Sequence, residues 1–160
     1  MRLSAWRSAA PRREALGPKV RAVLEPVLVT LGAEADPHVW IGWGEDAAYR
    51  FTLLVPTAGG LGLCVVRPTG GAEGPRVSAK LVRWSRAQVG DLDVDTQQGH
   101  RLATVQVEGT VLRGVDAEAD ALGRFVQALA SAVDGRGLPS LDEPGRRRAP
   151  ARRPRQIAGS

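Results

Sequence analysis

The stretch AYRFTLLVPTAGGLGLCVVR, residues 48–67, decides the fold class. Apolar and polar residues alternate in its first half, so one face of an extended strand would carry Tyr49, Phe51, Leu53 and Val55. Arg50 and Thr52 would point the other way. The turn residues PTAGG then lead into a second apolar run, LGLCVVR. The stretch therefore predicts a β-hairpin.

Clusters of turn residues divide the chain after His38 into further short strands. The loop RPTGGAEGP is followed by VSAKLVRW, QVGDLDVD and HRLATVQVEGTVL. In the last of these, one face carries Ala103, Val105 and Val107. Gly109 is a candidate for a bulge before Val111. The pattern predicts an antiparallel meander of about five or six strands.

Helical spacing flanks this sheet region on both sides. On the N-terminal side, apolar residues recur at helical spacing from Pro18 to Gly32, and Pro26 favours a kinked helix over a helix followed by a strand VLVTL. On the C-terminal side, Asp116 is a candidate helix cap and Gly135 a stop. The apolar stripe between them consists of Leu122, Phe125, Val126, Leu129 and Val133.

Together these elements predict an α+β domain. We expect the C-terminal helix to cover the apolar face of the meander, and the N-terminal helix to pack beside it or to close an open end. This order is similar to that of pleckstrin-homology-like domains and, with the N-terminal helix, to that of secretion-chaperone-like folds. The similarity concerns the fold alone and implies binding rather than chemistry, because function resides in sites.

Charge separates the chain into a body and two ends. Residues 14–137 are expected to form a single domain, 1–13 a basic flexible arm and 138–160 a disordered Arg/Pro-rich tail. Residues 1–13 hold four arginines and 144–160 six, whereas the remaining chain holds 12 basic and all 17 acidic residues. The net charge of +5 therefore comes from the ends, and an acidic body disfavours a polyanionic partner.

The composition limits the cellular compartments in which the protein is expected. The single cysteine, Cys64, excludes a disulfide or a multi-cysteine metal site within one chain. Apolar stretches such as VLVTL are shorter than the roughly 20 residues that span a bilayer. MRLSAWRSAAPRR lacks the apolar middle of a secretory signal. We therefore expect a bacterial, cytoplasmic protein without a membrane span.

The segment GDLDVDT resembles the start of a calcium loop. The first, third and fifth ligand positions of such a loop would be Asp91, Asp93 and Asp95. The sixth position, however, holds Thr96 instead of glycine, and the twelfth holds Leu102 instead of glutamate. The segment therefore favours an edge strand with Leu92 and Val94 inward and the aspartates in water, where charge discourages edge pairing.

Catalytic motifs are missing from the sequence. The only histidines are His38 and His100, and neither belongs to a nucleophile motif with Cys64, which lies in an apolar run. The glycine-rich AGGLG and TGGAEG lack the residues of a phosphate-binding loop. We expect no enzymatic activity, no metal and no cofactor; an active site of dispersed residues around either histidine is the alternative.

Tryptophans next to arginines are the preferred candidate site. Trp84 lies between Arg83 and Arg86, and strict alternation places it opposite the core-facing side of its strand. Trp40 likewise falls on the face opposite Val39, Ile41 and Trp43. Two tryptophans on the less buried face would form an apolar patch, which is typical of a protein contact. The hypothesis is a non-catalytic interaction module that binds a protein partner or itself through an exposed sheet face.

The alternative is a nucleic-acid accessory protein whose basic ends contact phosphates without sequence preference. Six arginines and no acid occupy RRRAPARRPR, residues 146–155; they are Arg146, Arg147, Arg148, Arg152, Arg153 and Arg155. If about six arginines met phosphates, the slope of log K against log salt would be near −5. A solubilising tail would have the same composition, so the tail permits nucleic-acid binding without requiring it.

Overall fold

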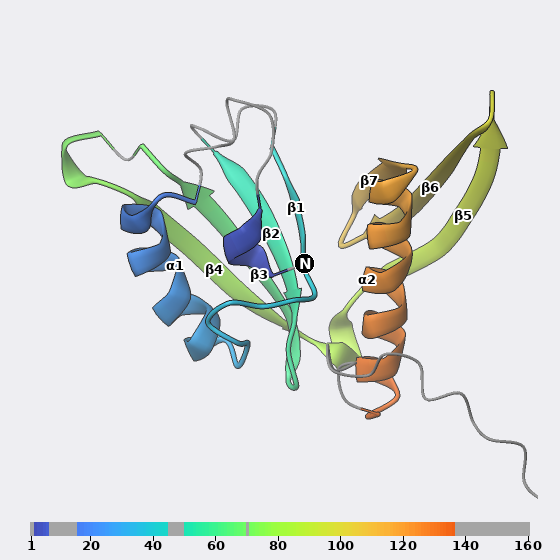
Figure 1. The fold of residues 1–160 in the computed structure, drawn as a ribbon. Helices are drawn as coiled ribbons and strands as arrows, with labels where there is room; N and C mark the ends of the chain where they lie inside the picture. Colours follow the sequence, from blue (N-terminus) through green and yellow to red (C-terminus); the bar gives the residue numbers. More distant parts are fainter. Residues whose placement is uncertain (1, 7–15, 45–49, 70, 137–160) are drawn as a thin grey trace, which may run out of the picture.

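The computed structural model describes residues 2–6, 16–44, 50–69 and 71–136 (Figure 1). Helix α1 (Pro18–Thr30) precedes the strands β1 (Ile41–Trp43), β2 (Phe51–Pro56), β3 (Gly60–Arg67) and β4 (Arg76–Arg83). After them come β5 (Val89–Gln97), β6 (His100–Val107), β7 (Thr110–Val115) and helix α2 (Ala117–Val133). Short 3₁₀ turns are η1 (Leu3–Ala5), η3 (Gly71–Glu73) and η4 (Trp84–Arg86).

The strands of the described residues form two antiparallel sheets. Sheet A has the order β1-β2-β3-β4, and sheet B has the order β5-β6-β7. The predicted α+β class, the antiparallel pairing and both helices are confirmed. The meander, however, is divided over two sheets, because η4 leads the chain out of sheet A after β4.

Sheet A is the middle layer of the molecule. Helix α1 lies on one of its faces, and sheet B with α2 lies on the other (Figure 1). The α1-side cluster comprises the buried residues Leu3, Val20, Leu24, Leu28, Phe51, Leu53, Val55, Cys64 and Val66. The α2-side cluster comprises Leu54, Leu61, Ala103, Val105, Val107, Leu112, Ala119, Leu122, Phe125 and Leu129. Both faces of this sheet are therefore covered at β2 and β3.

The central hairpin forms as its alternation predicts from Phe51 onward, while Tyr49 lies outside the described residues. Phe51, Leu53 and Val55 point into the α1-side cluster, while Leu54 points into the α2-side cluster. The turn between β2 and β3 is closed by the buried Thr57, whose Oγ1 donates to the Gly60 carbonyl oxygen at 2.9 Å and accepts from the Gly60 amide at 3.1 Å. Local sequence is sufficient to specify this element.

Helix α1 continues through Pro26, so the helix is confirmed and the alternative strand VLVTL is wrong. Pro18 occupies the first turn, where the missing amide hydrogen is not needed. Leu24 and Leu28 are buried against sheet A, whereas Pro26 is exposed. The ring of Pro26 therefore faces solvent, while the apolar side of the helix packs against sheet A.

The bulge predicted at Gly109 is wrong. Glu108 and Gly109 have φ values of 49° and 76° and form a two-residue turn between β6 and β7. Val107 pairs directly with Thr110 across this turn. Both central residues of such tight hairpin turns adopt positive φ, which glycine tolerates best. The stretch HRLATVQVEGTVL is therefore two strands, with Ala103 on the buried face as predicted.

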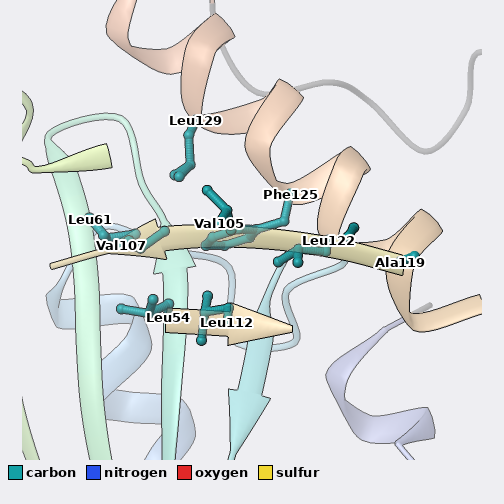
Figure 2. Close-up of a cluster of buried hydrophobic side chains, with 10 residues drawn as sticks. Leu54, Leu61, Val105, Val107, Leu112, Ala119, Leu122, Phe125 and Leu129 are labelled. Carbon is teal, nitrogen blue, oxygen red and sulfur yellow. The ribbon is translucent and has the colours of Figure 1, made fainter. Parts of the chain in front are cut away.

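Helix α2 packs most of its predicted stripe against sheet B. Leu122, Phe125 and Leu129 point toward the strand that carries Val105 (Figure 2). Val133 is 54% exposed, so the stripe ends one turn earlier than predicted. The β5–β6 hairpin extends beyond the helix (Figure 1).

The N-terminal segment differs from the predicted flexible arm. Residues 2–6 lie against the domain, and Leu3 is buried in the α1-side cluster. Residues 7–15 and the predicted tail, 138–160, lie outside the described residues. The tail arginines of the nucleic-acid hypothesis belong to that part of the chain, so their role stays a prediction.

Candidate functional site

The two candidate tryptophans lie on opposite faces of sheet A. Trp40 packs against the α1-side cluster, and its ring centroid is 5.1 Å from that of Trp6. Trp84 packs against the α2-side cluster, and its Nε1 donates to the Thr57 carbonyl oxygen at 3.2 Å. Both are partly buried. The prediction of a shared, exposed tryptophan patch is therefore wrong.

The alternation behind that prediction was correct. Val39, Ile41 and Trp43 pack on the α2 side and Trp40 on the α1 side, as strict alternation requires. The error was the assumption of a single buried face, because sheet B and α2 also cover the second face of sheet A. The tryptophans thus anchor two separate cores.

Arg83 and Arg86, the other two candidates, do lie together. They line an open pocket of about 520 Å³ with Leu81, Val82 and Ser85 at the end of β4. Both arginines are exposed, and Leu81 is 41% exposed despite its apolar side chain. Within the described residues, neither arginine forms an ion pair. The pocket therefore offers an apolar contact and two guanidinium groups to a ligand.

Strand β4 continues this surface as an edge strand. It pairs only with β3 among the described strands, so its outer backbone groups have no strand partner there. Ser78, Ala79, Lys80 and Leu81 are all exposed, so both faces are open at mid-strand. An exposed edge with free backbone donors and acceptors is a template for an added strand.

The β4 edge is also basic. Residues 74–90 contain Arg76, Lys80, Arg83 and Arg86 and no acid. Arg67 of β3 is exposed directly opposite Arg76, whose own guanidinium contacts Glu73. We call β4 with the η4 pocket the β4 edge surface. The acid-free run 74–90 was a sequence signal that could have identified it.

The three aspartates of β5 lie on an edge strand of the other sheet, sheet B. Asp91, Asp93 and Asp95 are exposed on an edge strand of sheet B, while Leu92 packs against the α2-side cluster. Val94 is 60% exposed and less covered than predicted. Among the described residues, no group of three or more His, Cys, Asp or Glu is placed to hold a metal ion. The aspartates instead give β5 a charge opposite to that of β4.

The histidines and the cysteine are not brought together. His38 Nδ1 lies 3.3 Å from Glu34 Oε2, and His100 Nδ1 lies 2.8 Å from Asp116 Oδ2. His100 is exposed at the β5–β6 turn, whereas Cys64 is buried in the α1-side cluster. Cys64 and His100 therefore do not form a nucleophile–base pair.

Asp116 occupies the cap position of α2, as predicted, but its carboxylate does not cap the helix. Its two oxygens accept from His100 and from the Arg101 amide, and these hydrogen bonds lower the pKa of the carboxyl. Asp116 has φ 50°, an uncommon value for a residue other than glycine. The carboxylate thus joins the β5–β6 turn to the start of the helix.

Burial makes the Cys64 thiol unreactive. Desolvation raises its pKa to about 11, from an ordinary value of 9.0. This difference lowers the thiolate fraction at pH 8, so we expect a thiol-reactive dye to label the folded chain about 100-fold more slowly than the chain unfolded in guanidinium. Equal labelling rates would show that the α1-side cluster does not protect this thiol.

Comparisons with known proteins returned no family model, no curated protein and no solved structure that matches this chain. Among the described residues, no helix is both long and apolar enough to cross a membrane. The functional argument therefore rests on the residues of the site.

Proposed function

We propose that this chain is a non-catalytic interaction module whose β4 edge surface binds an extended, acidic segment of a protein partner. The observation that carries the proposal is the placement of Arg83 and Arg86, which line an open pocket and form no ion pair among the described residues. A reducing cytoplasm, with which the single cysteine is compatible, belongs to the same proposal.

Three properties of the surface support this class of ligand. The free edge of β4 can pair with an added strand through backbone hydrogen bonds, which supply affinity without sequence preference. The exposed Leu81 can contact an apolar side chain of that strand. Arginine suits carboxylates because its guanidinium donates two parallel hydrogen bonds. An acidic strand with interspersed apolar residues therefore fits best.

Strand β5 of a second copy is one source of such a segment. Its sequence VGDLDVDTQ alternates aspartates with apolar residues, so it provides both the charge and the apolar contacts. Like-edge pairing, β4 with β4 or β5 with β5, would bring equal charges together. The remaining source is an acidic strand of a different protein.

The test uses a capped, fluorescent peptide of sequence VGDLDVDTQ and measures its binding to the full chain by anisotropy. We expect saturable binding that weakens at least 10-fold in the Arg83→Glu, Arg86→Glu double variant, which corresponds to about 1.4 kcal/mol. The matched control is Arg113→Glu, Arg124→Glu, which reverses two exposed arginines on β7 and α2. Equal weakening in both variants would reduce the effect to net charge and contradict the proposed site.

Two further experiments are needed. One distinguishes a second copy of the chain from a different protein as the source of the acidic segment, and the other tests nucleic acid as the ligand. Sedimentation of the full chain at high micromolar concentration detects self-association; a monomer that still binds the peptide indicates a different protein. Duplex DNA tests the nucleic-acid alternative. Binding to DNA with a slope near −5 that is lost on deleting residues 144–160, together with no peptide binding, would replace our proposal with that alternative.

A further inference from the structure

Residues 2–6 form a short segment that docks on the rest of the domain; we call it the strap. Leu3 is 4% exposed and belongs to the α1-side cluster. Trp6 packs against two aromatic rings, with centroid distances of 5.1 Å to Trp40 and 5.7 Å to Phe51. The strap is therefore fixed by an aliphatic side chain and an aromatic one, three positions apart.

Polar contacts fix its register between these two anchors. The Leu3 amide donates to the Pro37 carbonyl oxygen at 2.9 Å. Ser4 donates twice to Asp36, from its amide to Oδ1 at 2.7 Å and from Oγ to Oδ2 at 2.6 Å. Arg2 donates to the Asp36 carbonyl oxygen at 2.9 Å. The loop between α1 and β1 thus accepts hydrogen bonds from the strap, from two backbone amides, the Ser4 hydroxyl and the Arg2 guanidinium.

The receiving surface is shaped for the tryptophan. A Cβ at Gly42 would lie 2.9 Å from Leu53 Cδ2, 3.3 Å from the ring of Trp40 and 3.4 Å from the ring of Trp6. The absence of a side chain at Gly42 therefore leaves room for the two indoles, whose planes are tilted by 55°. We call this surface, formed by Asp36, Pro37, Trp40, Gly42 and Phe51, the strap groove.

We propose that the strap groove is a peptide-recognition site, and that the strap is its built-in competitor. The partner it fits is a protein segment with an aliphatic residue, a hydroxyl residue next to it and a tryptophan three positions after the aliphatic one. The strap contacts the groove only non-covalently, so a segment with the same side chains can make the same contacts in trans. This proposal uses a different surface from β4 and does not depend on it.

The covalent connection determines how strongly the strap competes. A segment that belongs to the same chain as its site has an effective concentration on the order of 1 mM there. If the strap sequence binds the free groove with a dissociation constant of about 10 μM, the strap in cis weakens an incoming peptide about 100-fold. A partner therefore needs a better anchor or a high local concentration to displace it.

The test adds a capped peptide, RLSAWR, to a chain that lacks residues 1–6. We expect saturable binding in the micromolar range by calorimetry. Binding should weaken at least 10-fold when the peptide carries Leu3→Asp or Trp6→Ala, or when the chain carries Asp36→Asn. A scrambled peptide of the same composition is the control. No saturable binding below about 1 mM, the concentration that the strap experiences in cis, would overturn the proposal.

Two readouts keep this test decisive if the shortened chain is less stable. A ligand that binds only the folded state raises the melting temperature by mass action, so 1 mM peptide should raise the melting temperature of the shortened chain. The intact chain should bind the same peptide about 100-fold more weakly. An unchanged melting temperature, or equal affinity for intact and shortened chains, would show that the peptide does not use the groove.

Discussion

Replacing Phe125 with alanine is expected to lower the free energy of unfolding by about 3–5 kcal/mol. The Phe125 side chain is 1% exposed and lies in the cluster that joins α2, sheet B and sheet A (Figure 2). Removal of its ring loses the transfer free energy and leaves a cavity between three elements, which cannot all move in to fill it. Since domains of this size are stable by about 5–15 kcal/mol, a large fraction of the stability would be lost.

Urea unfolding followed by tryptophan fluorescence measures this loss. Arg124→Ala is the matched control, because Arg124 is the preceding residue of the same helix and is exposed. We expect the control to change the free energy by less than about 0.5 kcal/mol. A loss below about 1.5 kcal/mol for Phe125→Ala would mean that α2 does not pack across sheet B as described.

Gly114→Ala is expected to destabilise the domain by about 3 kcal/mol or more. A Cβ at this position would lie 2.6 Å from the Glu118 carbonyl carbon and 2.7 Å from the Ala119 nitrogen. These atoms belong to the backbone of the first turn of α2, so no side-chain rotation relieves the contact. The helix would have to move away from β7, and its apolar stripe would separate from sheet B.

The same substitution elsewhere in this part of the chain should have the opposite sign. Gly123 lies within α2, and a Cβ there would have no neighbour within 4 Å. Gly123→Ala should therefore stabilise the domain by about 0.5–1 kcal/mol through helix propensity. Thermal unfolding of both variants gives the comparison. Equal effects of the two substitutions would contradict the close approach of β7 to α2.

Local patterns predicted the elements whose specification is local. Alternation in β2 predicted the shared face of Phe51, Leu53 and Val55 correctly, because a period of two is a property of the strand alone. The stripe of α2 and the hairpin turn at Thr57 were predicted for the same reason. Gly109 was misinterpreted because a glycine after a strand is compatible with a bulge or with a tight turn.

The sequence could not show which faces become covered. Whether Trp84 is exposed depends on where sheet B and α2 lie relative to sheet A, and that is a tertiary property. The packing of Leu3 and Trp6 against the domain could not be predicted either, because the basic composition of their segment indicated a flexible arm. Arg83 and Arg86 were candidates because they flank Trp84 in the sequence; they are exposed, as charged side chains at the end of an edge strand commonly are.

The most direct test of the proposed function is amide hydrogen exchange of the full chain with and without saturating VGDLDVDTQ peptide. Our account predicts that the outward amides of β4 exchange at least 10-fold more slowly with the peptide, because the added strand accepts their hydrogen bonds, while β1 and β5 are unchanged. Slowed exchange confined to other elements, or no change along β4, would contradict the claim that this edge is the binding site.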